Sequence, residues 1–396
     1  MVPRFRFTWL AGALALGCSQ PGSGPSPDAG GADVPFVWDL PPGFPEPIVP
    51  ADNPMTEGKV ALGRMLFYDK RLSADGSLSC ATCHRQERAF TDGHVTPAGI
   101  AGDLHPRNVP TLANVAYAPR LNWGDPVTRT LEAQMEGPLF GHGAPIVEMG
   151  LTDESRREAA LARLLADDRY PPRFEGAFPG VSAVSFEHVV KAVAAFERTL
   201  LSGGAAWDRY RAGDVSALDT AARRGLEMVA DHGAGTLCHH CHDGFNLSGQ
   251  VKHVDAPFDE VVFINIWLYN VGGTGAYPEG NQGLYEHTHL LSDRGKFRTP
   301  TLRNVAVTGP YMHDGSAAAL EDVVAIYEAG GRNVEEGPFA GDGRENPHKS
   351  AGLSGMSLTD GRRQDLLAFL NALTDEGFLV DPRFSNPYPG DESFGP

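Results

Sequence analysis

Two copies of one short motif, Cys-x-x-Cys-His, constrain this chain more than any other feature. The sequence is CATCH at residues 80–84 and CHHCH at residues 238–242. Two thiols spaced in this way reach both vinyl groups of one haem, and the adjacent histidine is held where it meets the iron. A single copy could instead bind zinc or perform redox chemistry, but two copies favour covalent haem. We therefore predict two haem c groups, with thioether bonds to Cys80, Cys83, Cys238 and Cys241 and proximal iron ligands at His84 and His242.

The fifth cysteine, Cys18, follows a segment typical of an export signal. Arg4 and Arg6 precede an apolar run at residues 7–17 that is too short to span a bilayer as an ordinary helix. We expect residues 1–17 to be a signal peptide of the lipoprotein type, which would leave a lipidated Cys18 as the first residue of the mature chain. The alternative is ordinary cleavage nearby, which would discard Cys18. Both readings predict a location on the periplasmic side of a bacterial membrane, where haem is attached.

Composition excludes one class of function and divides the chain. The net charge of −17, from 33 basic and 50 acidic residues, argues against nucleic-acid binding, because a phosphate backbone favours clustered Lys and Arg. Residues 18–50 are rich in Gly, Pro, Ser and Asp and predict a flexible tether. The aromatic residues at 38–44 could pack against the folded body.

The remaining sequence predicts a mainly α fold with long loops. Helical periodicity occurs at residues 59–68, 154–167, 186–201, 220–230, 320–328 and 359–373. The sequence before the first motif, at 58–67, is echoed before the second, at 222–229. We therefore predict two cytochrome c-like helical domains, at 51–213 and 214–396, each binding one covalent haem at or near the domain interface.

The function depends on what lies opposite each proximal histidine, since an open iron face permits chemistry and a filled face permits only electron transfer. Near the first motif, His94 and His105 are the strong ligands available, and neither lies on a convincing helical face. An open first haem is therefore favoured. For the second haem Met312, His313 and Tyr327 are all candidates, and periodicity alone does not choose among them. Tyr327 could also be only a half-buried helix residue.

Several runs of sequence resemble the dihaem cytochrome c peroxidase and MauG superfamily over nearly the whole mature chain. The runs that carry the resemblance are FTDG at 90–93, RNVPTLAN at 107–114, VEMG at 147–150, TPTLRN at 299–304 and TGPYMHDGS at 308–316. The resemblance implies roles for six further residues. These are an inter-haem tryptophan at Trp123, a distal-pocket glutamine at Gln134, a catalytic glutamate at Glu148, and a calcium site between the haems at Asn108, Thr308 and Pro310.

Departures from the peroxidases favour the MauG-like branch. Tyr327 occupies the position of their methionine ligand, and a phenolate oxygen favours high-valent iron where a thioether raises the potential. The peroxidases also have a distal histidine before Asn108, but His105 lies too close to Asn108 to be in register. The segment between Gln134 and Glu148 is longer than theirs, which predicts a differently shaped distal pocket. A permanently open first haem is expected.

Within that branch the chain looks most like the MbnH family, dihaem enzymes associated with methanobactin-type copper systems. The resemblance implies that hydrogen peroxide generates a bis-Fe(IV)-type state, which oxidises a tryptophan of a small secreted copper-binding partner to kynurenine. Glu148 would move the peroxide proton, Gln134 would orient the peroxide, and Trp123 would couple the haems. The alternatives are a dihaem peroxidase that draws electrons from a small redox protein, and a non-catalytic carrier with two filled haems.

Overall fold

The computed structural model describes residues 34–230, 238–256, 261–350 and 354–396, so the predicted signal peptide and Cys18 lie outside the described residues. The predicted mainly helical fold is confirmed. All six predicted helices form, as α1 (Glu57–Tyr68), α4 (Glu154–Leu165), α6 (Phe186–Arg198), α8 (Thr220–Ala230), α10 (Leu320–Ala329) and α11 (Asp360–Asn371). Within the described ranges no helix is long and apolar enough to cross a membrane.

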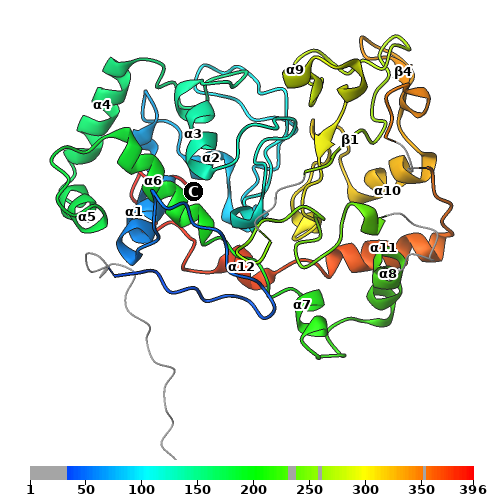
Figure 1. Cartoon of the computed structure of the whole chain (residues 1–396), viewed down its shortest axis with the longest axis horizontal. Coiled ribbons are helices and arrows are strands. Elements are labelled where there is room, and N and C mark those ends of the chain that lie inside the picture. Colours follow the sequence, from blue (N-terminus) through cyan, green and yellow to red (C-terminus); the bar gives the residue numbers. More distant parts are fainter. Residues whose placement is uncertain (1–33, 231–237, 257–260, 351–353) are drawn as a thin grey trace, which may run out of the picture.

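Shorter elements complete the structure. The additional helices are α2 (Cys80–Cys83), α3 (Leu131–Phe140), α5 (Tyr170–Ala177), α7 (Ala206–Arg211), α9 (Tyr285–Thr288) and α12 (Glu376–Val380). The strands form two antiparallel pairs, β1 (Phe263–Ile264) with β2 (Phe297–Arg298) and β3 (Asn333–Val334) with β4 (Gly341–Asp342). Figure 1 shows the helices in two groups, α1 to α6 on one side and α8, α10 and α11 on the other, with long loops between them.

Each group is built on one closely packed helix pair, α1 with α6 and α8 with α11. Both pairs cross at a glycine. A Cβ added to Gly63 of α1 would lie 1.9 Å from the Ala192 carbonyl oxygen, and one added to Gly225 of α8 would lie 2.0 Å from that of Asp365. The backbones therefore meet directly at these two positions. This contact gives a physical reason for the similarity between the sequences at 58–67 and 222–229, because each places a glycine where its helix crosses the partner helix.

Three apolar clusters form the interior. The first surrounds α1 and α6, the second surrounds α8 and α11, and a smaller third cluster around Tyr277 and Phe297 lies beside them. The end of the chain does not stay with the second cluster. Phe378 and Phe384 are buried in the first cluster, and the Tyr68 hydroxyl donates to the Phe384 carbonyl at 2.7 Å. The predicted boundary near residue 213 remains a prediction, but residues beyond α11 return to the first half.

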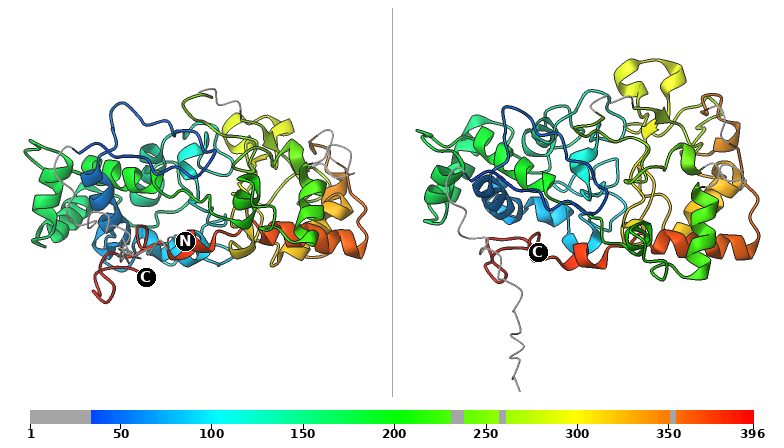
Figure 2. Two further views of the ribbon diagram at one scale, coloured as in Figure 1. Left: turned by 90° about the horizontal axis from the view of Figure 1, so that it is seen from below. Right: turned by 60° about the horizontal axis from the view of Figure 1, so that its bottom comes forward.

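The described part of the predicted tether, residues 34–50, lies along the folded body. Figures 1 and 2 show this segment in dark blue, running over the molecule from the first group of helices toward α7. Phe44 is buried, and its ring centroid lies 4.8 Å from that of Phe245 and 6.0 Å from that of Tyr117. The aromatic end of the segment therefore contacts both halves.

The glycine contact between α1 and α6 can be tested by adding a single methyl group. Gly63→Ala forces the two backbones apart, and overpacking of this kind costs about 1–3 kcal/mol. We expect a lower midpoint temperature when thermal unfolding of the haem-loaded protein is followed by circular dichroism. The control is Gly361→Ala in α11, where a Cβ meets no atom within 4 Å, so helix propensity alone should leave stability unchanged or slightly raised. Equal midpoints for the two variants would contradict the contact.

Candidate functional site

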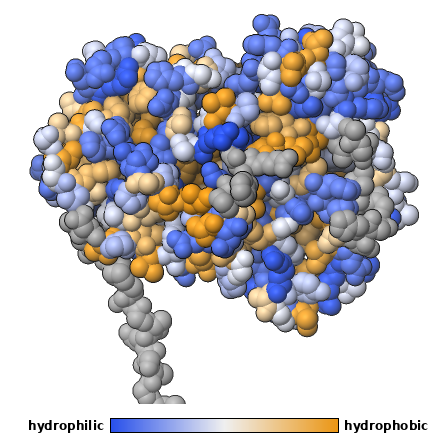
Figure 3. Space-filling model, viewed as in Figure 1, coloured by the Kyte–Doolittle hydropathy of each residue, from blue (hydrophilic) through white to orange (hydrophobic). Residues whose placement is uncertain are grey.

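Both Cys-x-x-Cys-His motifs open on one large cavity between the helix groups. Its volume is ≈ 960 Å³, and its lining includes Cys80, Cys83 and His84 of the first motif with Cys241 and His242 of the second. This volume is near the upper end of the range of about 300–1,000 Å³ for ligand pockets. Figure 3 shows hydrophobic side chains gathered toward the middle of the viewed face, where the two halves meet. The described cysteines form no disulfide, so all four thiols of the two motifs are available for thioether bonds.

The two motif histidines are oriented by the same kind of hydrogen bond. Nδ1 of His84 lies 2.8 Å from the Phe90 carbonyl oxygen, and Nδ1 of His242 lies 3.0 Å from that of Leu247. Because a carbonyl oxygen only accepts, Nδ1 carries the proton and Nε2 keeps its lone pair. Burial lowers the pKa of both histidines, which favours the neutral imidazole that binds a metal. The residues therefore fit the predicted role of proximal iron ligands.

An unusual backbone conformation places both accepting carbonyls. Phe90 has φ 63° and Leu247 has φ 49°, in the left-handed region that bulky residues rarely adopt. Both side chains are buried in their respective clusters. Tight turns after each motif thus return the backbone to the histidine ring, and the apolar side chains hold those turns in place.

Glu148 lies on the loop after α3 and lines the cavity near the first motif. Its Oε2 is buried and has no hydrogen-bond partner among the described residues. Burial raises the pKa of Glu148 to about 7. Burial raises the pKa of the Cys83 thiol, and the Asp92 and Glu148 carboxylates raise it further, so Glu148 lies close to the attachment point of the predicted first haem. A carboxyl group with this pKa can accept and return a proton near neutral pH.

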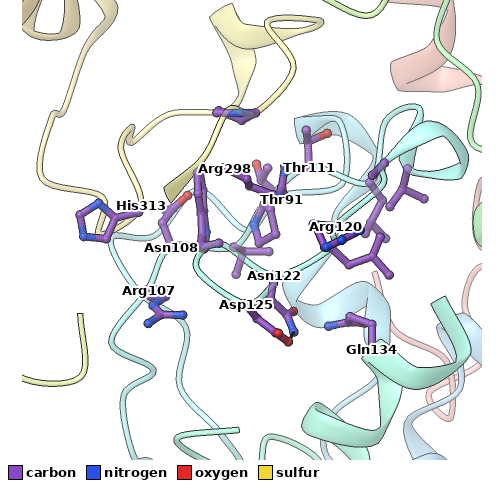
Figure 4. Close-up of a pocket in the computed structure, with 18 of the residues that line it drawn as sticks. Thr91, Arg107, Asn108, Thr111, Arg120, Asn122, Asp125, Gln134, Arg298 and His313 are labelled. Carbon is purple, nitrogen blue, oxygen red and sulfur yellow. Dashed lines mark hydrogen bonds between the residues drawn. The ribbon is translucent and has the colours of Figure 1, made fainter. Parts of the chain in front are cut away.

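Gln134 and Trp123 line the same cavity from different elements. Gln134 projects from α3, a helix that the Thr130 hydroxyl caps. In Figure 4 it lies on a different side of the pocket from Asn108 and Arg298. Trp123 lies on the loop before α3, where its indole Nε1 donates to the Asn108 carbonyl at 2.9 Å. The backbone N–H of Arg298 donates to the Trp123 carbonyl, also at 2.9 Å. Trp123 therefore joins segments from both halves of the chain.

The three residues expected to bind calcium, Asn108, Thr308 and Pro310, all line the cavity. The Asn108 side-chain nitrogen donates to the carbonyls of His94 and Val95, at 2.8 and 3.2 Å, which leaves its side-chain oxygen as the remaining acceptor. Amide and carbonyl oxygens suit a hard cation such as Ca²⁺. In the described ranges no group of three or more His, Cys, Asp or Glu is placed to hold a metal, so a calcium site here would depend on neutral oxygens.

Of the three candidates for the second iron, Tyr327 has the surroundings expected of a ligand. It projects from α10 into the cavity, and Cys238 and Cys241 act electrostatically on its phenol, so it lies close to the second motif. Burial raises its pKa well above the ordinary value. His313 instead stacks on Phe297 with centroids 3.7 Å apart, and burial lowers its pKa to about 4. Met312 also lines the cavity and packs against the third cluster.

The two histidines considered for the first iron differ in position. His94 is exposed and lies near Asp92, outside the cavity lining. His105 does line the cavity, and its Nδ1 lies 3.0 Å from the backbone nitrogen and 3.1 Å from the carbonyl oxygen of Arg107. Both contacts connect the ring to its own loop through Nδ1. The open face on the first haem stays a prediction.

Two charged residues in the cavity lining were missed from sequence. Glu197 of α6 is buried, its Oε2 has no partner within the described ranges, and burial raises its pKa to about 8. Glu197 follows Val189 and Val193 at helical spacing, on the face of α6 that lines the cavity. A carboxylate at the end of an apolar stripe is the sequence signal that could have indicated this residue. Arg298 of β2 also lines the cavity, and it directly precedes the run at 299–304 that carried the family resemblance.

These features define the class of protein, a c-type cytochrome with two haems. Each motif carries two thiols and one oriented imidazole, and both imidazoles line one shared cavity. A family model described as di-haem cytochrome c peroxidase matches residues 57–216. The cytochrome-c peroxidase IdrP1 of Denitromonas iodatirespirans is 36% identical, over 95% of this chain and 96% of its own length. The methylamine utilization protein MauG of Methylorubrum extorquens is 32% identical, over 83% of this chain and 81% of its own.

A solved structure is similar over most of its length. It is the crystal structure of a MauG-like protein associated with microbial copper homeostasis, with a TM-score of 0.85 and 46% identity, covering 89% of this chain and 99% of that chain. The chain described here belongs to the di-haem cytochrome c peroxidase/MauG family. The predicted resemblance is confirmed, and with it the predictions of two haem c groups and of a haem-dependent oxidoreductase.

The ligand role of Tyr327 can be tested by removing one oxygen atom. If Tyr327 binds the second iron, Tyr327→Phe should change the low-spin haem signals in the absorption and electron paramagnetic resonance spectra of the ferric protein. Tyr311→Phe is the matched control, because Tyr311 also lines the cavity but its hydroxyl donates to the Val305 carbonyl at 3.0 Å. Low-spin signals unchanged in Tyr327→Phe would rule out the assignment.

Proposed function

We propose that this protein uses hydrogen peroxide to oxidise a protein substrate, in the manner of the MauG-like branch of its family. The observation that carries the proposal is the buried carboxyl group of Glu148, which has a pKa of about 7 and lines the cavity beside the first motif. A protein that only carried electrons would not need such a proton acceptor. The position of Tyr327 near the second motif supports the same branch.

The chain would hold its haems in two cytochrome c-like halves through the four motif cysteines, with His84 and His242 as iron ligands. The bound haems supply the reaction with peroxide and storage of two oxidising equivalents. Tyr327 would be a further ligand of the second iron, whereas the family resemblance implies no such protein ligand for the first. The two haems would therefore have different roles.

Glu148 would act on protons at the first haem. In its ionised form Oε2 can take a proton from peroxide and return it to the departing oxygen, and no protein hydrogen bond within the described ranges competes for that atom. Gln134 lines the same cavity and would orient the peroxide through its side-chain amide.

Trp123 would connect the two halves electronically. Its indole Nε1 donates to the Asn108 carbonyl, and its own carbonyl accepts from the backbone N–H of Arg298. Trp123 is therefore held between segments of both halves. A calcium ion held by Asn108, Thr308 and Pro310 would stabilise the same region. Because charge would pass through side chains, the substrate protein could react at the surface and need not enter the cavity.

The proposed substrate is a tryptophan on a small secreted copper-binding protein, which would be converted to kynurenine. The support is the similarity to a MauG-like protein associated with microbial copper homeostasis, together with the sequence resemblance to methanobactin-associated enzymes. The reaction would take place on the periplasmic side of a bacterial membrane, with Cys18 as a lipid anchor if it is retained.

A second candidate is peroxide removal with electrons from a small redox protein. One observation favours it: the relative that matches 95% of this chain is named a cytochrome-c peroxidase. The two candidates differ in their electron donor. Peroxidase activity requires turnover with a reduced cytochrome or copper protein, and our proposal requires a stable change in the protein substrate.

The role of Glu148 predicts a pH dependence. A base must be ionised to accept a proton, so the rate constant for the reaction with peroxide should rise about tenfold per pH unit below pH 7 and level off above it. Glu148→Gln should lower the plateau by about 10²–10⁴-fold and remove the inflection. Stopped-flow absorption of the haem bands measures both effects.

The control for this experiment is Glu197→Gln, which removes the other buried carboxyl group of the cavity. Its pKa is about 8 and it lies near Cys80, so the inflection near pH 7 should persist in this variant. An inflection that persists in Glu148→Gln would show that another group accepts the proton.

The substrate assignment predicts a defined product. The test uses a copper-binding protein whose gene lies near the gene of this protein. After incubation with peroxide and the haem-loaded enzyme, it should carry kynurenine in place of one tryptophan, as detected by peptide mass spectrometry. The Glu148→Gln variant should give far less product in the same time. If no tryptophan of the partner gains oxygen while a reduced cytochrome is rapidly oxidised, the peroxidase function is the correct one.

A further inference from the structure

Arg298 is a buried cation for which the described residues supply no anion. Its Nε is buried without a hydrogen-bond partner, and its guanidinium lines the cavity. Burial alone lowers its pKa to about 10, with no contribution from any charged side chain. Uncompensated charge inside a protein is costly and is normally paired. A carboxylate that belongs to the functional protein is therefore expected beside Arg298.

The carboxylates that line the cavity interact elsewhere. Glu286 pairs with Arg107, and Asp125 accepts hydrogen bonds from Val127 and Thr128. The two remaining acids, Glu148 and Glu197, have their pKa values raised by burial, and Arg298 does not act on either. Protein carboxylates in the described part of the lining thus leave Arg298 without a partner.

The position of Arg298 is fixed by the backbone. It pairs with Phe263 across the β1–β2 ladder, and its N–H donates to the Trp123 carbonyl at 2.9 Å. The guanidinium carbon lies 5.3 Å from the centroid of the Trp123 ring. Figure 4 shows Arg298 close to Asn108, whose carbonyl accepts from the indole. The cation is therefore held over Trp123 at the edge of the space that two haems would share.

We propose that Arg298 binds the carboxylate of a haem propionate and thereby forms an ion pair on the face of Trp123. Thioether formation consumes the vinyl groups, so the two propionates are the charged groups that each haem brings into the cavity. A guanidinium matches a carboxylate with two parallel N–H bonds. The inference rests on haem binding and on the proposed place of Trp123 between the haems, and it does not depend on the oxidised partner.

The ion pair has a consequence for charge transfer. A bare guanidinium over an aromatic ring stabilises the neutral ring and opposes positive charge on it. A propionate beside Arg298 cancels that effect, so positive charge can pass through Trp123 at lower cost. Arg298 would be a positioning residue, because it acts through the propionate and the indole and does not touch peroxide.

The experiment measures the midpoint potentials of both haems in the fully loaded protein by spectroelectrochemistry. In Arg298→Gln the propionate loses its cation, which favours the ferric state, so one haem should show a lower potential. A tenfold change in its reduction equilibrium corresponds to about 59 mV for one electron. The haem that shifts identifies whose propionate Arg298 binds.

Arg294→Gln is the matched control. Arg294 also has a buried Nε without a partner among the described residues and lies over an aromatic ring, 4.8 Å from the centroid of Tyr285, but it does not line the cavity. Both potentials should remain at the wild-type values in this variant. Unchanged potentials in Arg298→Gln, or equal shifts in the two variants, would overturn the proposal.

A conservative variant covers the case in which Arg298→Gln does not fold or load haem. Arg298→Lys keeps the charge but replaces the two-pronged contact with a point charge. The potentials should then stay near the wild-type values, while the propionate-bending band in the resonance Raman spectrum moves because its hydrogen bonds change. A band identical to that of the wild type would show that Arg298 does not contact a propionate.

Discussion

The orientation of His84 and His242 depends on a hydrogen bond from each Nδ1 to a backbone carbonyl. The acceptors belong to Phe90 and Leu247, whose left-handed conformations each cost on the order of 1–3 kcal/mol. Glycine would adopt these conformations without that cost, but it would bury no side chain. Phe90 contacts Phe67 and Phe378, and Leu247 lies in the second cluster. Core packing therefore stabilises the turns that direct both imidazoles into one cavity.

The cavity also explains why several ionisable groups have no partner. Glu148, Glu197 and Arg298 each have a buried side-chain atom without a hydrogen bond in the described structure, and all three line the cavity. Such atoms are rare in folded proteins, and each requires an explanation. The two carboxyl groups have pKa values near neutrality, which suits proton exchange, whereas the guanidinium suits a fixed anion. The unpaired groups thus fit a site whose charges are completed by its prosthetic groups and substrate.

The sequence predicted what is local and missed what depends on long-range contacts. The six helices with apolar stripes were predicted from the sequence, and the motifs predict the haem attachment residues. Helix α3 was missed because Gly137 and Pro138 interrupt it, although Leu131, Met135 and Leu139 are buried at helical spacing. The return of the C-terminal segment was also missed, since loops without periodicity carry it back to the first half.

The same distinction between local sequence and long-range contacts applies to the site residues. The resemblance named Trp123, Gln134, Glu148 and the calcium residues, and the structure brings all of them to the cavity, but their roles remain predictions. Periodicity could not choose Tyr327 over Met312 because their positions relative to Cys241 depend on the fold of the intervening loops. Arg298 could not be recognised as unpaired from sequence, because only the folded chain shows which carboxylates are already engaged.

The two halves share a helix pair and a motif, yet their cavity walls differ in the protons they can exchange. The wall near His84 carries carboxyl groups that titrate around neutrality. Near His242 the corresponding group is the Tyr327 phenol, whose pKa is raised by burial, so it stays protonated unless a metal ion takes the place of the proton. On the proposed function, proton transfer would take place at the first motif and electron transfer at the second. Because the Arg298 guanidinium lies over the Trp123 ring, the charge beside the indole would then affect how readily an oxidising equivalent formed at the first haem is shared with the second.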